Sequence, residues 1–520
     1  MEPYETKCFH PLDIPVAPAT IPGPGNPFDV GFSATFHGPG GHAMTIPGYY
    51  DGDGGYVVRF SPTVEGQWHY ESHSPLPALD GLTGTVHCAP NDNPHVHGQL
   101  RVDAQHPQHF VYEDGTRCFL LGYEANWLMM MDQSPSDLAR VSPFLDSISR
   151  AGFDLLTVNA YAHSCRGWVS EEQERDSRYI TPALAPWIGG NAHPDYRQMD
   201  VAFFRHYDRV MLALHRRGIL AHIMIHVYNK QVNWPPLGSE DDDRFWRYII
   251  ARYQAFPNVI WDPAKESYYQ PAAYIWERMG IIRKLDGYHR LLTAHDANVP
   301  HVPGSEWSQR WHDPRKDLSD ALADFESDQV HDDWYADAQR NHNARQRPYV
   351  NVEYGYEQGV ERLPTYGVQQ DWREVLRRTW LVTMGGGYAN YYYSNTAWNL
   401  FAPTPEPPGY AAHRRYLDFW LGTHYWLLAP DNAPLTDTSR SGVYCRANPG
   451  QEYVVWDESG EGFALAITQA SAPLRGTWFN PLSGERCEAG EFANGAHRFL
   501  SPWGNENWVV LHLRPPSSPG

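Results

Sequence analysis

Residues 347–357, RPYVNVEYGYE, form a β-rich run that ends in a carboxylate, Glu353. Valine and tyrosine favour strands, and the flanking proline and glycine mark the limits of the run. An earlier stretch, residues 259–269 or VIWDPAKESYY, repeats this pattern and has Glu266 just after its apolar part. Both stretches are therefore predicted to be buried strands with a glutamate at the carboxyl end.

Working outward from these two stretches, apolar strand-like runs alternate with amphipathic helical segments between Cys118 and Tyr393. This order is typical of βα units around a parallel sheet. Eight alternations over about 280 residues match a (β/α)8 barrel, whose active site lies at the carboxyl ends of its strands. The eight runs are CFLLGY, FDLLTVNAY, ILAHIMIHVY, NVIWD, RLLTAH, ADFES, PYVNVEY and YANYYY.

The helical segments are predicted between these runs. The clearest one, from Met199 to Arg217, has its apolar residues spaced by three or four positions, which gives a single apolar stripe. These residues are Phe203, Tyr207, Val210, Met211 and Leu214. Similar patterns follow Ser134, Asp241, Pro271 and Asp371.

Short β-rich runs separated by turn residues lie on both sides of the barrel region, and they predict antiparallel sandwiches. The predicted fold is α/β: a (β/α)8 TIM barrel flanked by N-terminal and C-terminal antiparallel β-sandwich domains. We place the N-terminal sandwich at residues 1–105, the barrel at 106–428 and the C-terminal sandwich at 429–520.

Composition narrows the classes of function. The chain has 520 residues, 42% of them hydrophobic, and a net charge of −20 with no run of lysines or arginines, which disfavours nucleic acid as a partner. Its six cysteines lack CxxC spacing, so neither a zinc cluster nor a disulfide framework is expected. Neither a membrane span nor a signal peptide is visible, and a cytoplasmic location is expected. A homo-oligomer is left open.

Two carboxyl groups facing each other across a cleft can cleave a glycosidic bond, one as proton donor and the other as nucleophile or base. The chain is also rich in aromatic residues, 14% of the total, whose flat apolar faces suit stacking on sugar rings. The sequence therefore predicts a sugar hydrolase with a carbohydrate substrate. An exo-acting enzyme on a short oligosaccharide or glycoside suits the expected location.

Several motifs resemble one group of barrel enzymes. NPFDVGFSATF (26–36), PGYYDGDGGYVVRFSPTVEGQWHY (47–70) and LDGLTGTVHC (79–88) resemble the N-terminal sandwich of apiosidase-like proteins in the clan-A glycoside hydrolases. EYGYEQG (353–359) and TMGGGYANYYY (383–393) resemble the seventh and eighth strands of that group. YVVWDESGEGFALAI (453–467) and GTWFNPLSGE (476–485) are similar to its C-terminal collagen-binding-type sandwich.

The resemblance implies that Glu266, after strand four, is the acid/base and that Glu353, at strand seven, is the nucleophile. A retaining mechanism is expected, and it requires the two carboxyls to lie about 5 to 5.5 Å apart, whereas an inverting pair would lie roughly 6.5 to 9.5 Å apart. One residue departs from the clan pattern, because the asparagine that precedes the acid/base in that clan is Lys265 here. A lysine cation beside Glu266 would lower the pKa of that carboxyl, which is unfavourable for a general acid. Three interpretations remain open: Lys265 points away, it binds an anionic or unusual sugar, or the barrel has lost its activity.

Further substrate-binding candidates follow from their positions at or just past predicted strand ends, where polar and aromatic side chains can reach a bound sugar. These candidates, besides Lys265, are Tyr123, Glu124, Trp127, Asn159, His163, Trp168, His226, Asn229, His295, Tyr356 and Trp398.

Two alternatives to a glycosidase were considered. A catalytically retired barrel could act as a carbohydrate-binding protein. A metal-dependent barrel hydrolase would need His-x-His at the end of strand one, where the sequence is GYEANW, and the pair with that spacing, His95 and His97, falls in the predicted linker. No metal and no other cofactor is therefore predicted.

Overall fold

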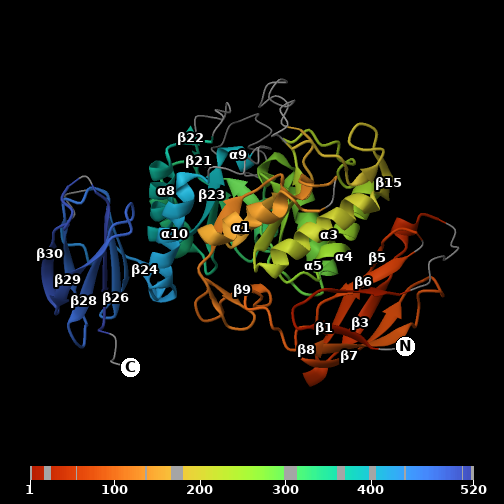
Figure 1. Cartoon of the computed structure of the whole chain (residues 1–520), viewed down its shortest axis with the longest axis horizontal. Helices are drawn as coiled ribbons and strands as arrows, with labels where there is room; N and C mark the ends of the chain where they lie inside the picture. Colours follow the sequence, from red (N-terminus) through yellow and green to blue (C-terminus); the bar gives the residue numbers. More distant parts are fainter. Residues whose placement is uncertain are drawn as a thin grey trace.

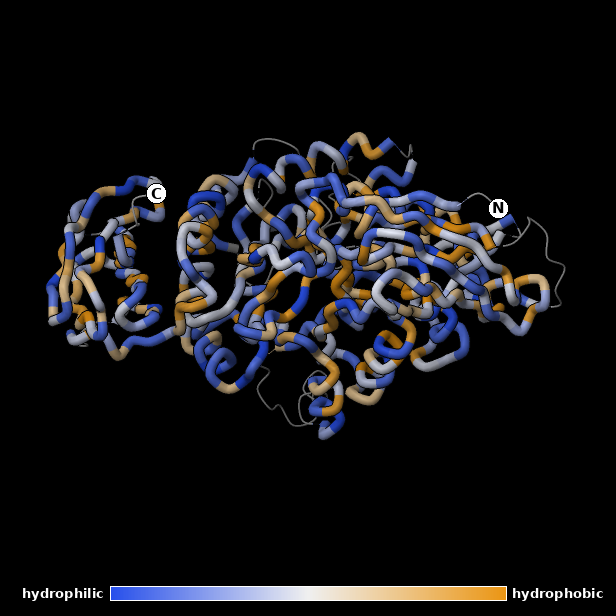
Figure 2. Tube along the Cα trace, turned by 90° about the horizontal axis from the view of Figure 1, so that it is seen from below, coloured by the Kyte–Doolittle hydropathy of each residue, from blue (hydrophilic) through white to orange (hydrophobic). Residues whose placement is uncertain are grey.

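The computed structural model describes residues 3–16, 25–53, 55–134, 137–164, 180–297, 313–359, 369–397, 406–437, 441–505 and 507–516. A barrel occupies the centre, an N-terminal sandwich packs on one side of it, and a C-terminal sandwich stands at the opposite end (Figure 1). Figure 2 shows the same arrangement from below. Among the described residues, no helix combines the length and the apolarity needed to cross a bilayer.

The barrel sheet pairs its strands in parallel in the order β17-β16-β13-β12-β23-β20-β19-β18. This confirms the predicted fold class. Within the described residues the eight strands are β12 (Leu121–Glu124), β13 (Leu155–Asn159), β16 (Leu220–Val227), β17 (Val259–Lys265), β18 (His295–Ala297), β19 (Glu326–Gln329), β20 (Tyr349–Glu353) and β23 (Tyr388–Tyr393).

Each barrel strand is followed by a helix on the outside of the barrel (Figure 1). These helices are α1 (Val141–Ala151), α3 (Val201–Arg216), α4 (Glu240–Tyr253), α5 (Ala272–Leu285), α6 (Arg315–Asp320), α7 (Trp334–Ala344), α8 (Trp372–Met384) and α10 (Pro408–Leu421). Side chains of Asp200, Ser239 and Asp371 cap the first turns of α3, α4 and α8 by accepting a backbone N–H. The helix predicted from Met199 to Arg217 is confirmed as α3.

Strands five and six differ from the predicted runs RLLTAH and ADFES. The backbone of Trp261 in β17 pairs with Leu291 and Thr293, which closes the barrel, but β18 itself runs later, at His295–Ala297, where the chain pairs with β19. Strand six is β19, Glu326–Gln329. Its residues are all polar, so an apolar pattern could not mark it.

The N-terminal sandwich has two sheets, and one of its pairs, β1 with β8, is parallel. The first sheet contains β1 (Tyr4–Lys7), β8 (Thr83–Ala89), β7 (Gly66–His73), β3 (Ser33–His37) and β4 (Ala43–Pro47); the second contains β2 (Leu12–Pro15), β6 (Tyr56–Phe60) and β5 (Tyr49–Tyr50). A small sheet of β9 (Leu100–Val102), β10 (Phe110–Tyr112) and β11 (Arg117–Cys118) connects this sandwich to the barrel.

The C-terminal sandwich packs a six-stranded antiparallel sheet against a two-stranded one. The strands are β24 (Ala429–Pro430), β25 (Val443–Asn448), β26 (Glu452–Asp457), β31 (Val509–Arg514), β28 (Leu474–Phe479) and β29 (Arg486–Phe492), and then β27 (Phe463–Ile467) and β30 (Gly495–Phe499). It contacts the barrel through an aromatic pair, Tyr335 and Tyr444, whose ring centroids lie 4.4 Å apart. A hydrogen bond adds to this contact, because Arg446 donates to the carbonyl of Thr383 in α8. The domain boundaries at residues 105 and 428 stay predictions.

The N-terminal sandwich is attached to the barrel by a largely buried ion network. Asp208 of α3 accepts from Arg59 of the sandwich at 2.9 Å and from Arg252 of α4 at 2.6 Å. Burial raises the pKa of the Asp208 carboxyl, but the two guanidiniums outweigh burial and hold that pKa well below its ordinary value. The carboxylate is therefore the charge partner that the two buried guanidiniums share, while Arg59 also pairs with Asp13 and Arg252 with Asp51.

We expect Asp208→Asn to lower the free energy of unfolding by about 3 kcal/mol, because Arg59 and Arg252 stay buried with their shared charge partner removed. Unfolding in denaturant followed by circular dichroism measures this loss. The wild-type contribution is complete above pH about 4, the ordinary pKa of an aspartate, and is lost as pH falls further. Asp195→Asn, in a solvent-exposed pair with Arg197, is the control and should cost less than about 0.5 kcal/mol. Equal losses in the two variants would contradict the assignment.

Candidate active site

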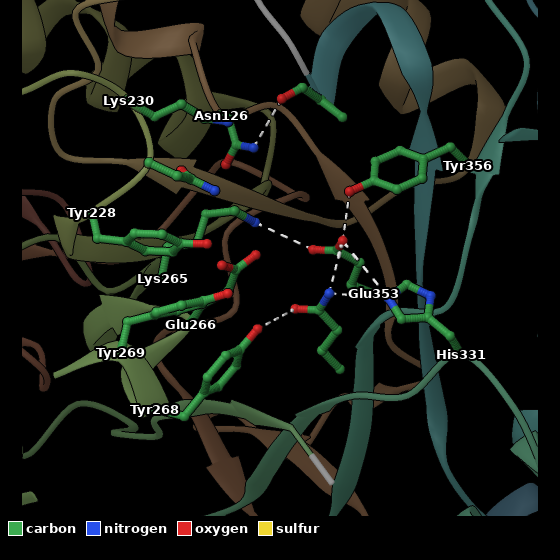
Figure 3. A pocket seen from close by; sticks show the side chains of 13 residues that line it. Asn126, Tyr228, Lys230, Lys265, Glu266, Tyr268, Tyr269, His331, Glu353 and Tyr356 are labelled. Atoms are coloured by element: carbon green, nitrogen blue, oxygen red, sulfur yellow. Dashed lines mark hydrogen bonds and ion pairs between the residues drawn. The ribbon is translucent and has the colours of Figure 1, made fainter. Parts of the chain in front are cut away.

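A cavity of about 380 Å³ opens at the carboxyl ends of the barrel strands and contains both predicted catalytic glutamates (Figure 3). Its position agrees with the rule that barrel enzymes place their sites at this end. The lining residues come from six of the eight strand ends and the loops that follow them. They are Asn126, Tyr228, Asn229, Lys230, Lys265, Glu266, Tyr268, Tyr269, Gln329, His331, Glu353, Tyr356 and Ala397.

Glu353 is the last residue of β20, and its carboxylate is surrounded by donors. The Oε1 atom accepts from the amide of Gln329 at 3.0 Å and from the hydroxyl of Tyr356. The Oε2 atom accepts from the hydroxyl of Tyr392 at 2.9 Å and lies 3.4 Å from Nζ of Lys265. These contacts fix both oxygens and favour the ionised carboxylate.

Glu266 follows β17 directly and lies in an unusual backbone conformation. Its φ of +54° and ψ of +60° place it in the left-handed region, which costs energy for a residue with a Cβ. The turn directs its carboxyl group into the cavity, where it faces that of Glu353 (Figure 3). Its side chain is only about 7% exposed, and the hydroxyl of Tyr228 hydrogen-bonds to it.

Lys265 points into the barrel, so the interpretation in which it points away is wrong. Its ammonium group lies 3.4 Å from Oε1 of Glu124, 3.4 Å from Oε2 of Glu353 and 3.3 Å from the hydroxyl of Tyr392. Burial would lower the pKa of Lys265, but the three carboxylates around it, Glu124, Glu353 and Glu266, raise that pKa above its ordinary value. The side chain is therefore a permanent cation at the floor of the cavity.

The two catalytic candidates differ in pKa. For Glu353, burial is outweighed by the Lys265 cation and the surrounding donors, and the pKa is lowered to about 2. For Glu266, burial is the largest effect, the charge of Glu353 adds to it, and the pKa is raised in spite of Lys265. The predicted lowering by Lys265 is present but smaller than the effect of burial. One carboxyl is thus held ionised and the other is favoured in its protonated form, the division expected of an acid and a nucleophile.

The other candidates from the sequence fall into three groups. Asn229 and Tyr356 line the cavity, and Glu124 reaches it through Lys265. Tyr123 does not line it: its hydroxyl accepts from Thr396 and Tyr410. The third group, which also lies outside the lining, is Trp127, Asn159, His163, His226 and His295.

The three histidines are held by other contacts. His226 stacks on Trp234 with centroids 4.6 Å apart, and burial lowers its pKa to about 3. His295 lies 3.3 Å from Oε1 of Gln329, and burial together with Lys265 lowers its pKa to about 3. A ring nitrogen of His163 pairs with the hydroxyl of Tyr161. His226 and His295 are therefore neutral at pH 7.

Trp168 and Trp398 lie outside the described residues, so their predicted role in substrate binding stays a prediction. In the described ranges, no three His, Cys, Asp or Glu side chains gather into a group able to hold a metal ion.

Among the residues that line the cavity without having been singled out from the sequence are Lys230, Tyr268, Tyr269 and Gln329. In KESYY, Tyr268 and Tyr269 come shortly after Glu266, and this closeness in the sequence could have revealed them. Lys230 lies a few residues after the third barrel strand, and this position past a strand end could have revealed it as well. Gln329 could not be found, because strand six was predicted to end before it.

Comparison with known protein families identifies two parts of the chain. The family model for "Apiosidase-like, catalytic domain" matches residues 104–431. A second model, "Domain of unknown function (DUF5060)", matches residues 5–75 in the N-terminal sandwich. A comparison with curated proteins found no match.

Solved structures share the whole architecture. A protein from Bacteroides vulgatus, named a "putative glycoside hydrolase", superposes with a TM-score of 0.76 at 20% identity, covering 98% of this chain and 99% of that one. A glycoside hydrolase family 5 protein from the same species gives a TM-score of 0.62 at 16% identity, covering 81% of this chain and 95% of that one. At these identities the likeness establishes the fold. The apiosidase-like match spans more than half of the sequence, and the chain therefore belongs to the apiosidase-like glycoside hydrolases, glycosidases with a clan-A barrel.

Proposed function

We propose that this glycosidase is retaining and exo-acting, with Glu353 as nucleophile and Glu266 as acid/base. The observation that carries the proposal is the opposite direction of the two pKa shifts in carboxyl groups that face each other across one cavity. A nucleophile has to be ionised when the substrate binds, and a general acid has to be protonated. The two pKa shifts are in the directions that favour these two states.

In the first step, the Glu353 carboxylate attacks the anomeric carbon while Glu266 transfers its proton to the glycosidic oxygen, and the leaving group departs as a neutral alcohol. The sugar is then esterified to Glu353, which has lost its negative charge. In the second step, Glu266 takes a proton from a water molecule as the water oxygen attacks the anomeric carbon, and Glu353 is released as a carboxylate. Two displacements at one carbon retain its configuration.

The electrostatics favour both roles of Glu266 in turn. Before the first step, the negative charge of Glu353 helps to raise the pKa of Glu266 and keeps its proton in place. Esterification removes that charge, while the cation of Lys265 remains and lowers the pKa of Glu266. The residue therefore becomes a better base when the mechanism needs one.

Exo action is supported by the size of the cavity. Its volume of about 380 Å³ lies near the lower end of the range of ligand pockets. Such a space suits a terminal sugar better than the interior of a long chain.

The rival function is a carbohydrate-binding protein on a barrel that no longer turns over substrate. The Lys265 departure motivated this alternative, but the contacts of Lys265 stabilise the ionised nucleophile candidate. Hydrolysis of any member of a glycoside panel that includes furanosides and uronides would decide for the enzyme. Binding without cleavage across the panel would decide for the rival.

Glu353→Gln should abolish hydrolysis, because the amide cannot attack the anomeric carbon. Glu266→Gln should lower kcat/KM by about 10²- to 10⁴-fold, with the larger loss for substrates whose leaving group needs a proton. Steady-state rates on aryl glycosides and disaccharides measure both effects, and proton NMR of the first product should show retained configuration.

Glu357→Gln is the matched control for these two variants. Glu357 is a buried glutamate four residues after the nucleophile, with a pKa raised to about 7 by burial, and its carboxyl bonds to Tyr391 and the backbone of Gly409 outside the cavity. Its substitution should leave kcat/KM within about twofold. Wild-type rates in Glu353→Gln, or an inverted product, would overturn the mechanism.

Lys265→Asn should move the whole pH profile of kcat/KM to higher pH. The cation lowers the pKa of both glutamates, so its loss raises the pKa of Glu353, which must be ionised, and shifts the acidic limb upward. The same loss raises the pKa of Glu266, which must be protonated, and shifts the basic limb upward. Lys284→Asn, on the exposed last turn of α5, is the control and should leave both limbs in place. An unshifted profile in Lys265→Asn would refute the charge coupling.

A further inference from the structure

Two tyrosines that line the catalytic cavity form a stacked aromatic pair. Tyr228 and Tyr269 both line the cavity, and their rings stack with centroids 3.9 Å apart and planes 26° from parallel. Tyr269 belongs to the short turn Ser267–Tyr269 that begins directly after Glu266. The hydroxyl of Tyr228 hydrogen-bonds to the Glu266 carboxyl, which fixes the pair relative to the acid.

Tyr269 is exposed in spite of this stacking. Its side chain is 41% accessible, and among the large hydrophobic side chains that are exposed in the described part of the chain, it alone lines the cavity. Tyr228 stacks on the ring and the tilted ring of Tyr268 lies 4.7 Å from it between centroids, and the area that stays exposed leaves aromatic surface available beside the cavity. An exposed ring held at a site by a second ring is a surface on which another flat apolar face can stack.

The contacts of the two glutamates indicate which part of a substrate would meet this ring. Gln329 and Tyr356 line the cavity and bond to Glu353, so they border the sugar that the nucleophile attacks. Tyr228 bonds instead to Glu266, the proton donor. Because the acid protonates the oxygen of the leaving group, the surface beside Glu266 borders the leaving group rather than the attacked sugar.

We propose that Tyr269, supported by Tyr228, is a binding platform for the leaving group of the substrate. The ligand chemistry it fits is a ring that presents a flat apolar face, either a second sugar or an aryl aglycone. This inference rests on the proposed function and deepens it, because it assigns the residue that selects the group released in the first step.

The test compares substrates that carry the same sugar and differ only in the leaving group. A panel of 4-nitrophenyl glycosides first identifies the sugar that is cleaved fastest. Three substrates of that sugar are then compared: the 4-nitrophenyl glycoside, a disaccharide and the glycosyl fluoride. Tyr269→Ala should raise KM for the ring-bearing substrates by about 3- to 10-fold, the effect of one stacked ring pair. The kcat/KM for the fluoride should not change, because fluoride reaches no platform. A loss confined to the aryl substrate or to the disaccharide would identify which ring the platform accepts.

Two further variants separate stacking from other roles of Tyr269. Tyr269→Phe keeps the ring face and should retain the wild-type KM. Trp276→Ala removes an aromatic side chain on α5 that is equally exposed, at 40%, but lies outside the cavity, and it should affect none of the substrates. An equal loss on the fluoride and the ring-bearing substrates in Tyr269→Ala, or no loss on any of them, would overturn the platform.

A binding measurement keeps the inference testable without turnover. Phenyl 1-thioglycosides of the panel sugars should bind the wild-type chain more tightly than the methyl 1-thioglycosides, and Tyr269→Ala should remove this difference in calorimetry. The same affinity difference in the variant would overturn the platform. Failure of the proposed function would look different: no hydrolysis of the fluoride by the wild type, or unchanged hydrolysis in Glu353→Gln.

Discussion

The buried ammonium group of Lys265 is the interaction on which the site depends. It joins the carboxylates of Glu124 and Glu353 and the hydroxyl of Tyr392, and these four residues come from β17, β12, β20 and β23. A charge this deeply buried is tolerated only when opposite charges and oxygens surround it. The strands that carry these groups therefore have to converge at one height in the barrel, which is where the cavity opens.

The same cation explains how two glutamates in one cavity can differ in protonation. It lies against Glu353, whose pKa falls to about 2, while burial dominates for Glu266, whose pKa rises. The resemblance to clan-A enzymes implies an asparagine that contacts the sugar at this position. Here the ammonium group of Lys265 lies against three oxygens of the protein, two carboxylates and one hydroxyl.

The outer parts of the molecule hold the loops around the site in place. Asp208 links the N-terminal sandwich to α3 and α4, the helices that follow the second and third barrel strands. At the other end, Arg446 bonds to the last turn of α8, which leads into the eighth strand. Both sandwiches thus contact helices on the outside of the barrel, without contributing a lining residue to the cavity themselves.

The sequence by itself determined the alternation of strands and helices and the placement of Glu266 and Glu353 at strand ends. These features follow from local periodicity and from turn chemistry, which a single stretch of chain contains. Only the tertiary structure decided that Lys265 points inward, that Gln329 bonds to Glu353, and that His226 and His295 pack outside the cavity lining. The direction of a side chain and its pKa depend on burial and on charges that come from strands far away in the sequence. Glu124 beside Lys265 is an example, and the residues next to Lys265 in the sequence do not predict this contact.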